Sequence, residues 1–181
     1  MACNVTLTGI GYSCEANLSG VKAVYICDYE DVSTMTVSNH NITAITMKSG
    51  KKFYEYVFNK NTASLTSTLT KDETNGYQYY TNELAGNINK MDTTKHIEIG
   101  ELMQGRLNCI VNDKNGMFWF LGTDNYATGT ACVAQTGAAP EDGNFYQLTI
   151  TDESKELPYS IDSSIISGIV SQATYAAENN G

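Results

Sequence analysis

The sequence predicts a mainly β protein, built as a β-sandwich or barrel with one flanking α-helix and a long β-hairpin. Three observations predict it: many short segments alternate apolar and polar residues, one segment carries helix-capping signals, and an Asn-Gly pair joins two apolar segments. The chain has 181 residues, of which 41% are hydrophobic. That length and composition suit a single domain with a substantial core.

The first predicted strands follow an arm, residues 1–20, that is rich in small, polar and glycine residues. Val21–Asp28 has the pattern of a strand, and because both of its faces are fairly apolar we expect it in the centre of a sheet. Val32–Val37 and Ile42–Lys48 are β-branched and alternating, which is typical of half-buried strands. The Ser-Asn-His-Asn segment between them predicts a turn.

The long hairpin is predicted from Lys52 to Leu84. Phe53–Phe58 alternates, and after an Asn-Lys-Asn turn the strand Thr62–Thr70 follows. Tyr77–Leu84 is its expected partner across the loop Lys71–Gly76, which is rich in turn-forming residues. One face of the strand before the loop is uniformly polar and consists of Thr62, Ser64, Thr66, Thr68 and Thr70.

The flanking helix is predicted over Asp92–Gln104. Asp92, Thr93 or Thr94 would cap its start, and Gly105 would end it. Its apolar face would consist of Ile99, Leu102 and Met103. A strand remains an alternative here, since Ile97-Glu98-Ile99 alternates and Gly100 weakens a helix.

The last third predicts a tight hairpin and several further strands. Leu107–Asn112 and Met117–Leu121 flank an Asn-Gly turn, and both faces of the second strand are apolar or aromatic. Ala127–Ala134 is a weaker strand, Phe145–Thr151 is a clear one, and Tyr159–Ile161 is expected at a sheet edge. The remaining residues, 163–181, are small and polar, with an apolar start able to dock.

The net charge of −9 and a pI near 4.6 exclude a protein that grips nucleic acid through a basic surface. An acidic surface suits a conduit along which DNA slides without sticking, and it also suits ordinary solubility. No apolar run approaches the length of a membrane span, so we predict no membrane anchor. The odd number of cysteines without a CxxC pair favours free thiols: Cys3, Cys14, Cys27, Cys109 and Cys132.

Patterns that carry chemistry are missing from the sequence. There is no GxSxG elbow, and neither His40 nor His96 has a cysteine at zinc-ligand spacing. Carboxylate pairs such as Glu98 and Glu101 are interpreted as solvated residues rather than a glycosidase pair. We therefore predict that the protein is not an enzyme and has no catalytic residues, metal or cofactor; a small hydrolase is the disfavoured alternative.

Three segments, Leu65–Leu69, Thr94–Ile99 and Trp119–Gly122, resemble tail-associated proteins of phages that infect gut Bacteroidetes. The order of a long hairpin, a helix, a tight hairpin and a late strand resembles the phage tail tube and major tail protein superfamily, which includes tube subunits of contractile secretion systems. The resemblance covers about residues 45–155. It divides the chain into an N-terminal arm (1–20), a tail-tube-like β domain (21–162) and a C-terminal extension (163–181).

The resemblance implies a virion structural protein. Six identical copies would form a ring, and stacked rings would form a tail tube that contacts other tail proteins and conducts phage DNA without binding it specifically. The tube would assemble in the host cytoplasm and belong to the virion tail. By position, the hairpin from Lys52 to Leu84 would line the channel, with its polar face toward the lumen or solvent. The residues that would touch the next ring are Lys71, Asp72, Glu73, Thr74, Asn75 and Gly76.

Two alternatives stay open at the level of sequence. A carbohydrate- or receptor-binding β-sandwich on a virion or cell surface would use aromatic residues for stacking: Tyr77, Tyr79, Tyr80 and Trp119. An ordinary monomeric β domain would simply have a wet threonine face. Assembly is favoured over the monomeric domain mainly because of the resemblance to the tail tube superfamily. It is consistent with the physics of sheet edges, since identical neighbours around an axis would pair the edges that an open sheet leaves exposed.

Overall fold

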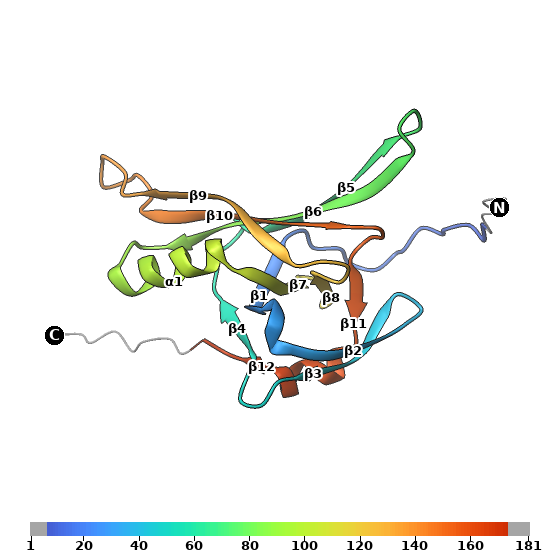
Figure 1. The fold of residues 1–181 in the computed structure, drawn as a ribbon. Coiled ribbons are helices and arrows are strands. Elements are labelled where there is room, and N and C mark those ends of the chain that lie inside the picture. The colour runs from blue at the N-terminus through green and yellow to red at the C-terminus, as the bar shows by residue number, and fades with distance from the viewer. Residues whose placement is uncertain (1–6, 174–181) are drawn as a thin grey trace.

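The computed structural model describes residues 7–173, which form a mainly β fold with two short helices (Figure 1). The two helices are α1 (Thr93–Gln104) and α2 (Ser163–Ile169). A 3-10 turn covers Tyr29–Asp31. The strands are β1 (Val21–Asp28), β2 (Val32–Ser38), β3 (Asn41–Met47), β4 (Phe53–Tyr56), β5 (Ser64–Asp72), β6 (Tyr77–Asn89), β7 (Arg106–Asp113), β8 (Phe118–Leu121), β9 (Ala127–Gln135), β10 (Phe145–Ser154), β11 (Tyr159–Ile161) and β12 (Val170–Ser171).

The strands form one hydrogen-bonded sheet of 12 strands that bends into two layers. The upper layer in Figure 1 is antiparallel and has the order β5-β6-β10-β9. The lower layer has the order β12-β4-β1-β7-β8-β11-β3-β2. The layers are joined where β9 pairs with the start of β7, at Arg106↔Thr128 and Leu107↔Ala127. The prediction of a β-sandwich with a long hairpin is therefore confirmed.

The core consists of two hydrophobic clusters, one on each face of β1 and β7. The first cluster lies between the layers, where Val24 and Val111 meet Leu84, Leu148 and α1. The second lies on the far face and includes Tyr25, Ile110, Phe120 and α2. Because β1 is buried on both faces, the expectation that it lies centrally in a sheet is confirmed. The two faces of β8 divide as expected, with Leu121 in the first cluster and Phe120 in the second.

The segment predicted as the flanking helix is helical. Asp92 is its N-cap and accepts a hydrogen bond from the Lys95 N–H at 2.9 Å, and Gly105 is its C-cap. Ile99 and Leu102 are buried against the first cluster. Burial of these two side chains in the first cluster, with the helix packed against β9, decides for the helix over the alternating strand that the sequence left open.

The long hairpin is shorter at its start and longer at its end than predicted. It consists of β5 and β6, over Ser64–Asn89, and it excludes the segment from Lys52 onward, because β4 pairs with β1 and β12 in the lower layer. Thr62 lies before β5 in a turn, where its hydroxyl donates to the Asn59 carbonyl at 2.8 Å. Alternation identified β4 as a strand, but it carries no information about which strand is the partner.

The C-terminal segments also differ from expectation. β11 is not an edge strand: it lies between β8, to which it is antiparallel, and β3, to which it is parallel. The predicted extension begins with α2, whose Asp162 cap accepts from the Ser164 N–H at 2.9 Å. Ile166 and Ile169 of this helix are buried in the second cluster, so the apolar start of the extension does dock. Residues 174–181 lie outside the described residues.

Candidate assembly surface

The four-stranded upper layer presents one face to the sandwich core and the other face outward. Residues directly opposite each other in the ladder point to the same side. One row of partners crosses the layer from Thr66 through Glu83 and Thr151 to Thr128. Neighbouring residues of each strand, such as Leu84 and Ile150, point into the first hydrophobic cluster. The row therefore belongs to the outer face of the layer.

This outer face is polar and acidic. Of the predicted channel-lining residues it holds Ser64, Thr66, Thr68 and Thr70, whereas Thr62 lies in the preceding turn. Glu83, Glu153 and Asp72 also point outward by register. Within the paired residues of these four strands, the outward positions include no lysine or arginine. The other outward residues are Tyr77, Tyr79, Thr81, Ala85, Asn87, Asn89, Phe145, Gln147, Thr149, Thr151, Thr128, Ala131, Val133 and Gln135.

The layer ends in two free strand edges among the described residues. β5 pairs only with β6, and beyond its first two residues β9 pairs only with β10. The second half of β9, from Thr130 to Gln135, is exposed, and Val133 is 48% exposed. Sequence reasoning did not assign any role to this segment. The sequence feature that could have indicated a free edge is that this strand consists of small residues without a polar face, which is unusual for a solvent-exposed edge.

The two edges are offset along the strand direction. β5 lies level with Tyr77–Ala85 of β6, whereas the free half of β9 lies, across β10, level with Ala85–Asn89. The layer is therefore a parallelogram rather than a rectangle, and its two hairpins project at opposite ends of the molecule (Figure 1). Such an offset is the local counterpart of the stagger that tilts strands in a closed barrel.

The tip of the β5–β6 hairpin is organised by Asp72. Its carboxylate accepts hydrogen bonds from the Thr74 N–H at 2.8 Å, the Asn75 N–H at 3.1 Å and the Asn75 side-chain amide at 2.6 Å. These bonds, the side-chain amide first, hold the pKa of Asp72 below its usual value. Lys71 pairs with Glu73 at 2.8 Å, and Gly76 has a φ of +70°. The tip is a self-supported, exposed turn that extends beyond the sandwich (Figure 1).

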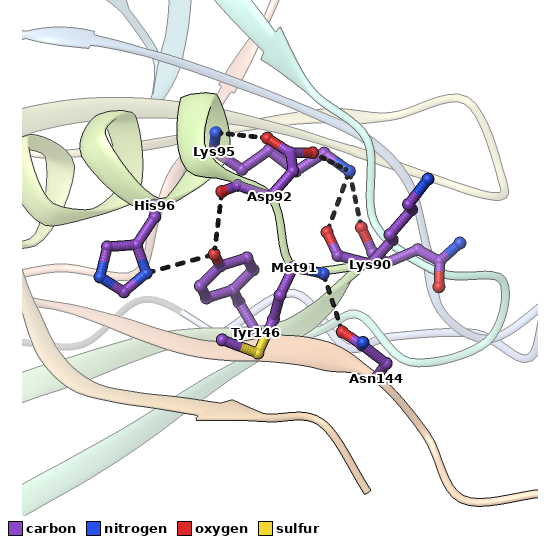
Figure 2. A network of polar contacts seen from close by, with 8 residues as sticks. Lys90, Met91, Asp92, Lys95, His96, Asn144 and Tyr146 are labelled. Atoms are coloured by element: carbon purple, nitrogen blue, oxygen red, sulfur yellow. Dashed lines mark hydrogen bonds and ion pairs between the residues drawn. The ribbon is translucent and has the colours of Figure 1, made fainter. Parts of the chain in front are cut away.

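A polar network fixes the start of α1 beneath the β9–β10 side of the layer (Figure 2). The Tyr146 hydroxyl of β10 donates to the Asp92 carbonyl at 3.3 Å and lies 3.3 Å from His96 Nδ1. The Lys95 ammonium donates to the Lys90 carbonyl at 3.2 Å and lies 3.3 Å from the Asp92 carboxylate. The Met91 N–H donates to the Asn144 side chain at 2.8 Å. His96 is thus part of a structural anchor at the edge of the sandwich.

The opposite side of the sandwich, beneath β5, forms a groove that is also lined by the segment 17–21 at the start of β1. Two adjoining hollows, of about 430 and 710 Å³, share three of their lining residues: Trp119, Leu157 and Pro158. Leu65 lines the first hollow and Tyr80 the second, both from the inner face of the hairpin. We call this hollow the β5 groove. Several large apolar side chains around it are exposed, among them Leu157 at 54% and Met117 at 45%.

The aromatic residues considered for sugar stacking are divided between two faces. Tyr77 and Tyr79 lie on the outer face of β6 with their ring centroids 6.0 Å apart. Tyr80 and Trp119 line the β5 groove, and the indole N–H of Trp119 donates to Asp113 at 3.1 Å. A single aromatic platform made of all four residues is therefore not formed. His40 lies in the β2–β3 turn, 3.1 Å from Glu156, and is exposed.

The reactive groups found in residues 7–173 do not gather into a centre. Over this range no group of three or more His, Cys, Asp or Glu side chains is placed to hold a metal ion. Cys27 and Cys109 are buried free thiols, as predicted, and burial raises the pKa of each. Cys14 and Cys132 are exposed free thiols. None of the helices in the described part of the chain is long and apolar enough to span a membrane.

No protein-family model matches the chain, and comparisons with curated proteins and with solved structures give no significant match. The features of this chain that bear on its function are the polar outer face, the two free edges and the β5 groove.

Proposed function

We propose that the protein is a virion structural protein that forms hexameric, stacked rings of a phage tail tube, through which DNA passes. The observation that carries this proposal is the pair of free edges on the upper layer. In the order β5-β6-β10-β9 every pair is antiparallel, so β9 and the β5 of a rotated neighbouring copy also run antiparallel. Repetition of this one contact would extend the layer from copy to copy. If the copies are related by a rotation axis, the extended layer would close into a ring.

The offset of the two edges supports closure into a barrel. It amounts to about six residues, or about 20 Å along a layer that is about 19 Å wide, which corresponds to a strand tilt of about 45°. Four strands from each of six copies, tilted in this way, would give a barrel radius of about 26 Å. A barrel of that size has room for double-stranded DNA inside its side chains.

The chemistry of the outer face supports its assignment to the lumen. Thr66, Thr68 and Thr151 offer small hydroxyl groups, and Glu83 and Glu153 offer negative charge. The paired outward positions of the layer include no lysine or arginine that could bind a phosphate group. The acidic residues of this face would therefore repel DNA electrostatically instead of binding it. The opposite choice, with this face on the outside of a ring, would place the sandwich core and both helices in the channel.

The first test is the oligomeric state of the purified protein. We expect hexamers by light scattering, and rings or tubes by negative-stain electron microscopy. A protein that remains monomeric at all concentrations would contradict the proposal. A monomer that also binds glycans on an array would instead support the carbohydrate-binding alternative.

The second test maps the β9–β5 contact with native Cys132, in a background carrying Cys3→Ser and Cys14→Ser. Cys132 lies opposite Leu148 and points to the inner side of the layer, so its cross-strand partner must also point inward. We expect disulfide-linked multimers when an inward residue of β5 is replaced, in the series S67C, L69C and K71C. The outward series T66C, T68C and T70C serves as the matched control. Equal cross-linking in both series would rule out a paired edge.

A further inference from the structure

We infer that α1 of one copy seats in the β5 groove of the next copy, so that each ring contact has a helix-in-groove component beneath the strand pair. This inference rests on the proposed function and identifies a second surface of the same contact.

The first argument is that both features lie on the inner side of the upper layer. α1 closes the sandwich beneath β9 and β10, where Met103 lies against Gly129 and His96 lies against Tyr146. The β5 groove opens beneath the other edge of the same layer, under Leu65. When β5 of one copy pairs with β9 of the next, the upper layer continues across the contact. The helix α1 beneath that β9 then lies on the same side of the layer as the β5 groove of the first copy.

The second argument concerns height along the strands. The start of α1 lies level with Tyr146, which is opposite Ile88, and its end lies near Gly129, which is opposite Ile150. An offset of about six residues between copies moves this helix opposite the outer half of β5. Gln78 and Tyr80, the β6 partners of that half of β5, line the larger hollow of the groove. The helix and the hollow therefore coincide in height as well as in side.

The third argument is the surface of the helix itself. Ile97 is 59% exposed, and Gly100, one turn later, lies on the same face. A Cβ atom added at Gly100 would meet nothing within 4 Å, so packing within the chain does not require a glycine there. Glycine is unfavourable inside a helix, and a bare backbone surface suits close approach by another chain. The exposed Leu157 and Met117 of the groove supply an apolar counterpart to Ile97.

The test compares two helical glycines that have equal space around them. Gly168 in α2 also has nothing within 4 Å of an added Cβ, but it lies away from both proposed contact surfaces. We expect Gly100→Leu and Gly168→Leu to fold, with unchanged circular dichroism. Gly100→Leu should raise the protein concentration needed for ring formation by about tenfold or more, whereas Gly168→Leu should leave it at the wild-type value.

A cross-linking measurement accompanies the comparison. Copies carrying Ile97→Cys are mixed with copies carrying Leu157→Cys, both in a background with the other exposed cysteines replaced, and treated with a short bis-maleimide. A linked heterodimer that depends on having both variants supports the inference.

The outcomes separate this inference from the proposed function. If wild-type rings form and Cys132 links to inward residues of β5, but Gly100→Leu assembles as well as Gly168→Leu, the strand contact stands and the helix docking is overturned. If the wild type forms no ring and no Cys132 link, the proposed function itself is wrong, and the docking falls with it.

Discussion

Asn82 and Asp152 face each other across β6 and β10 in the interior of the sandwich, and the Asn82 amide donates to Asp152 Oδ2 at 3.3 Å. Both side chains are at most 2% exposed. The Gly122 N–H donates to the same carboxylate oxygen at 3.1 Å, and Asn82 also donates to Ser154 at 2.9 Å. Asp152 Oδ1 and Asn82 Oδ1 accept no hydrogen bond from the described residues. Burial raises the pKa of Asp152, against the effect of its two hydrogen bonds.

The raised pKa of Asp152 predicts a pH dependence of stability. Between its unfolded value, near 3.8, and its higher folded value, the folded chain holds a proton that the unfolded chain has lost. The contribution of Asp152 to the free energy of unfolding is therefore complete below the unfolded pKa, and it is lost as pH rises through the folded pKa. Asp152→Asn should remove this loss and raise the free energy of unfolding at neutral pH by about 1.4 kcal/mol per unit of pKa difference.

Asparagine suits this position because its carbonyl can accept from Gly122 while its amide donates to Asn82 Oδ1. Urea unfolding between about pH 4 and pH 8 measures the free energy of unfolding of the wild type and of the variant. The effects of the other carboxylates are common to both proteins and cancel when the two values are subtracted. A variant that is less stable than the wild type at every pH would show that the carboxylate is charged and satisfied in the folded state.

The surroundings of Gly122 leave no space for a side chain, so a substitution there should lower stability. Its φ is +98°, and an added Cβ would collide with Asn108 Oδ1 and lie 3.0 Å from the Leu107 carbonyl. Gly122→Ala should therefore cost about 3 kcal/mol of unfolding free energy, from backbone strain and displacement of Asn108. Gly116→Ala is the matched control, because Gly116 has a φ of +87° and open space. It should cost about 1 kcal/mol, and equal losses in the two variants would contradict the steric argument.

The hairpin tip predicts a separation of ring formation from ring stacking. Asp72 and Tyr77 are partners in the β5–β6 ladder, so an Asn-Gly turn can replace residues 73–76, shorten the tip and leave the paired part of the hairpin in place. We expect this variant to form single rings by electron microscopy without stacking into tubes, because the tip would touch the next ring. Tubes of normal length would show that Glu73, Thr74, Asn75 and Gly76 have no role between rings.

The outer face predicts how DNA interacts with the tube. Thr66→Lys combined with Thr68→Lys would place positive charge on a face whose paired positions carry none. In assembled tubes this variant should retain DNA fragments at low salt and release them as the salt concentration rises. Thr36→Lys, on exposed β2 in the lower layer, is the control and should retain less. Equal retention by the two variants would place the outer face of the layer outside the channel.

Most of the strands and their buried and exposed faces were predictable from the sequence alone. Alternation located β1, β5 and β10, and the Asn-Gly turn located the β7–β8 hairpin, because periodicity and turn chemistry are local properties. The Asp92 cap and the Gly105 stop marked the ends of the helix for the same reason, whereas the choice of helix over strand depended on burial of Ile99 and Leu102. The polar threonine face was also visible in the sequence, apart from Thr62, which a local turn removes from the strand.

Which strands are neighbours was not predictable from the sequence and follows from the tertiary fold. The assignment of β4 to the lower layer, of β11 between β3 and β8, and of β9 to a free edge depends on pairing between distant segments. The β5 groove and the Asn82–Asp152 contact depend on it as well. Strand pairing is set by hydrogen bonds and burial summed over the whole sheet, and alternation specifies a face of a strand without specifying its partner.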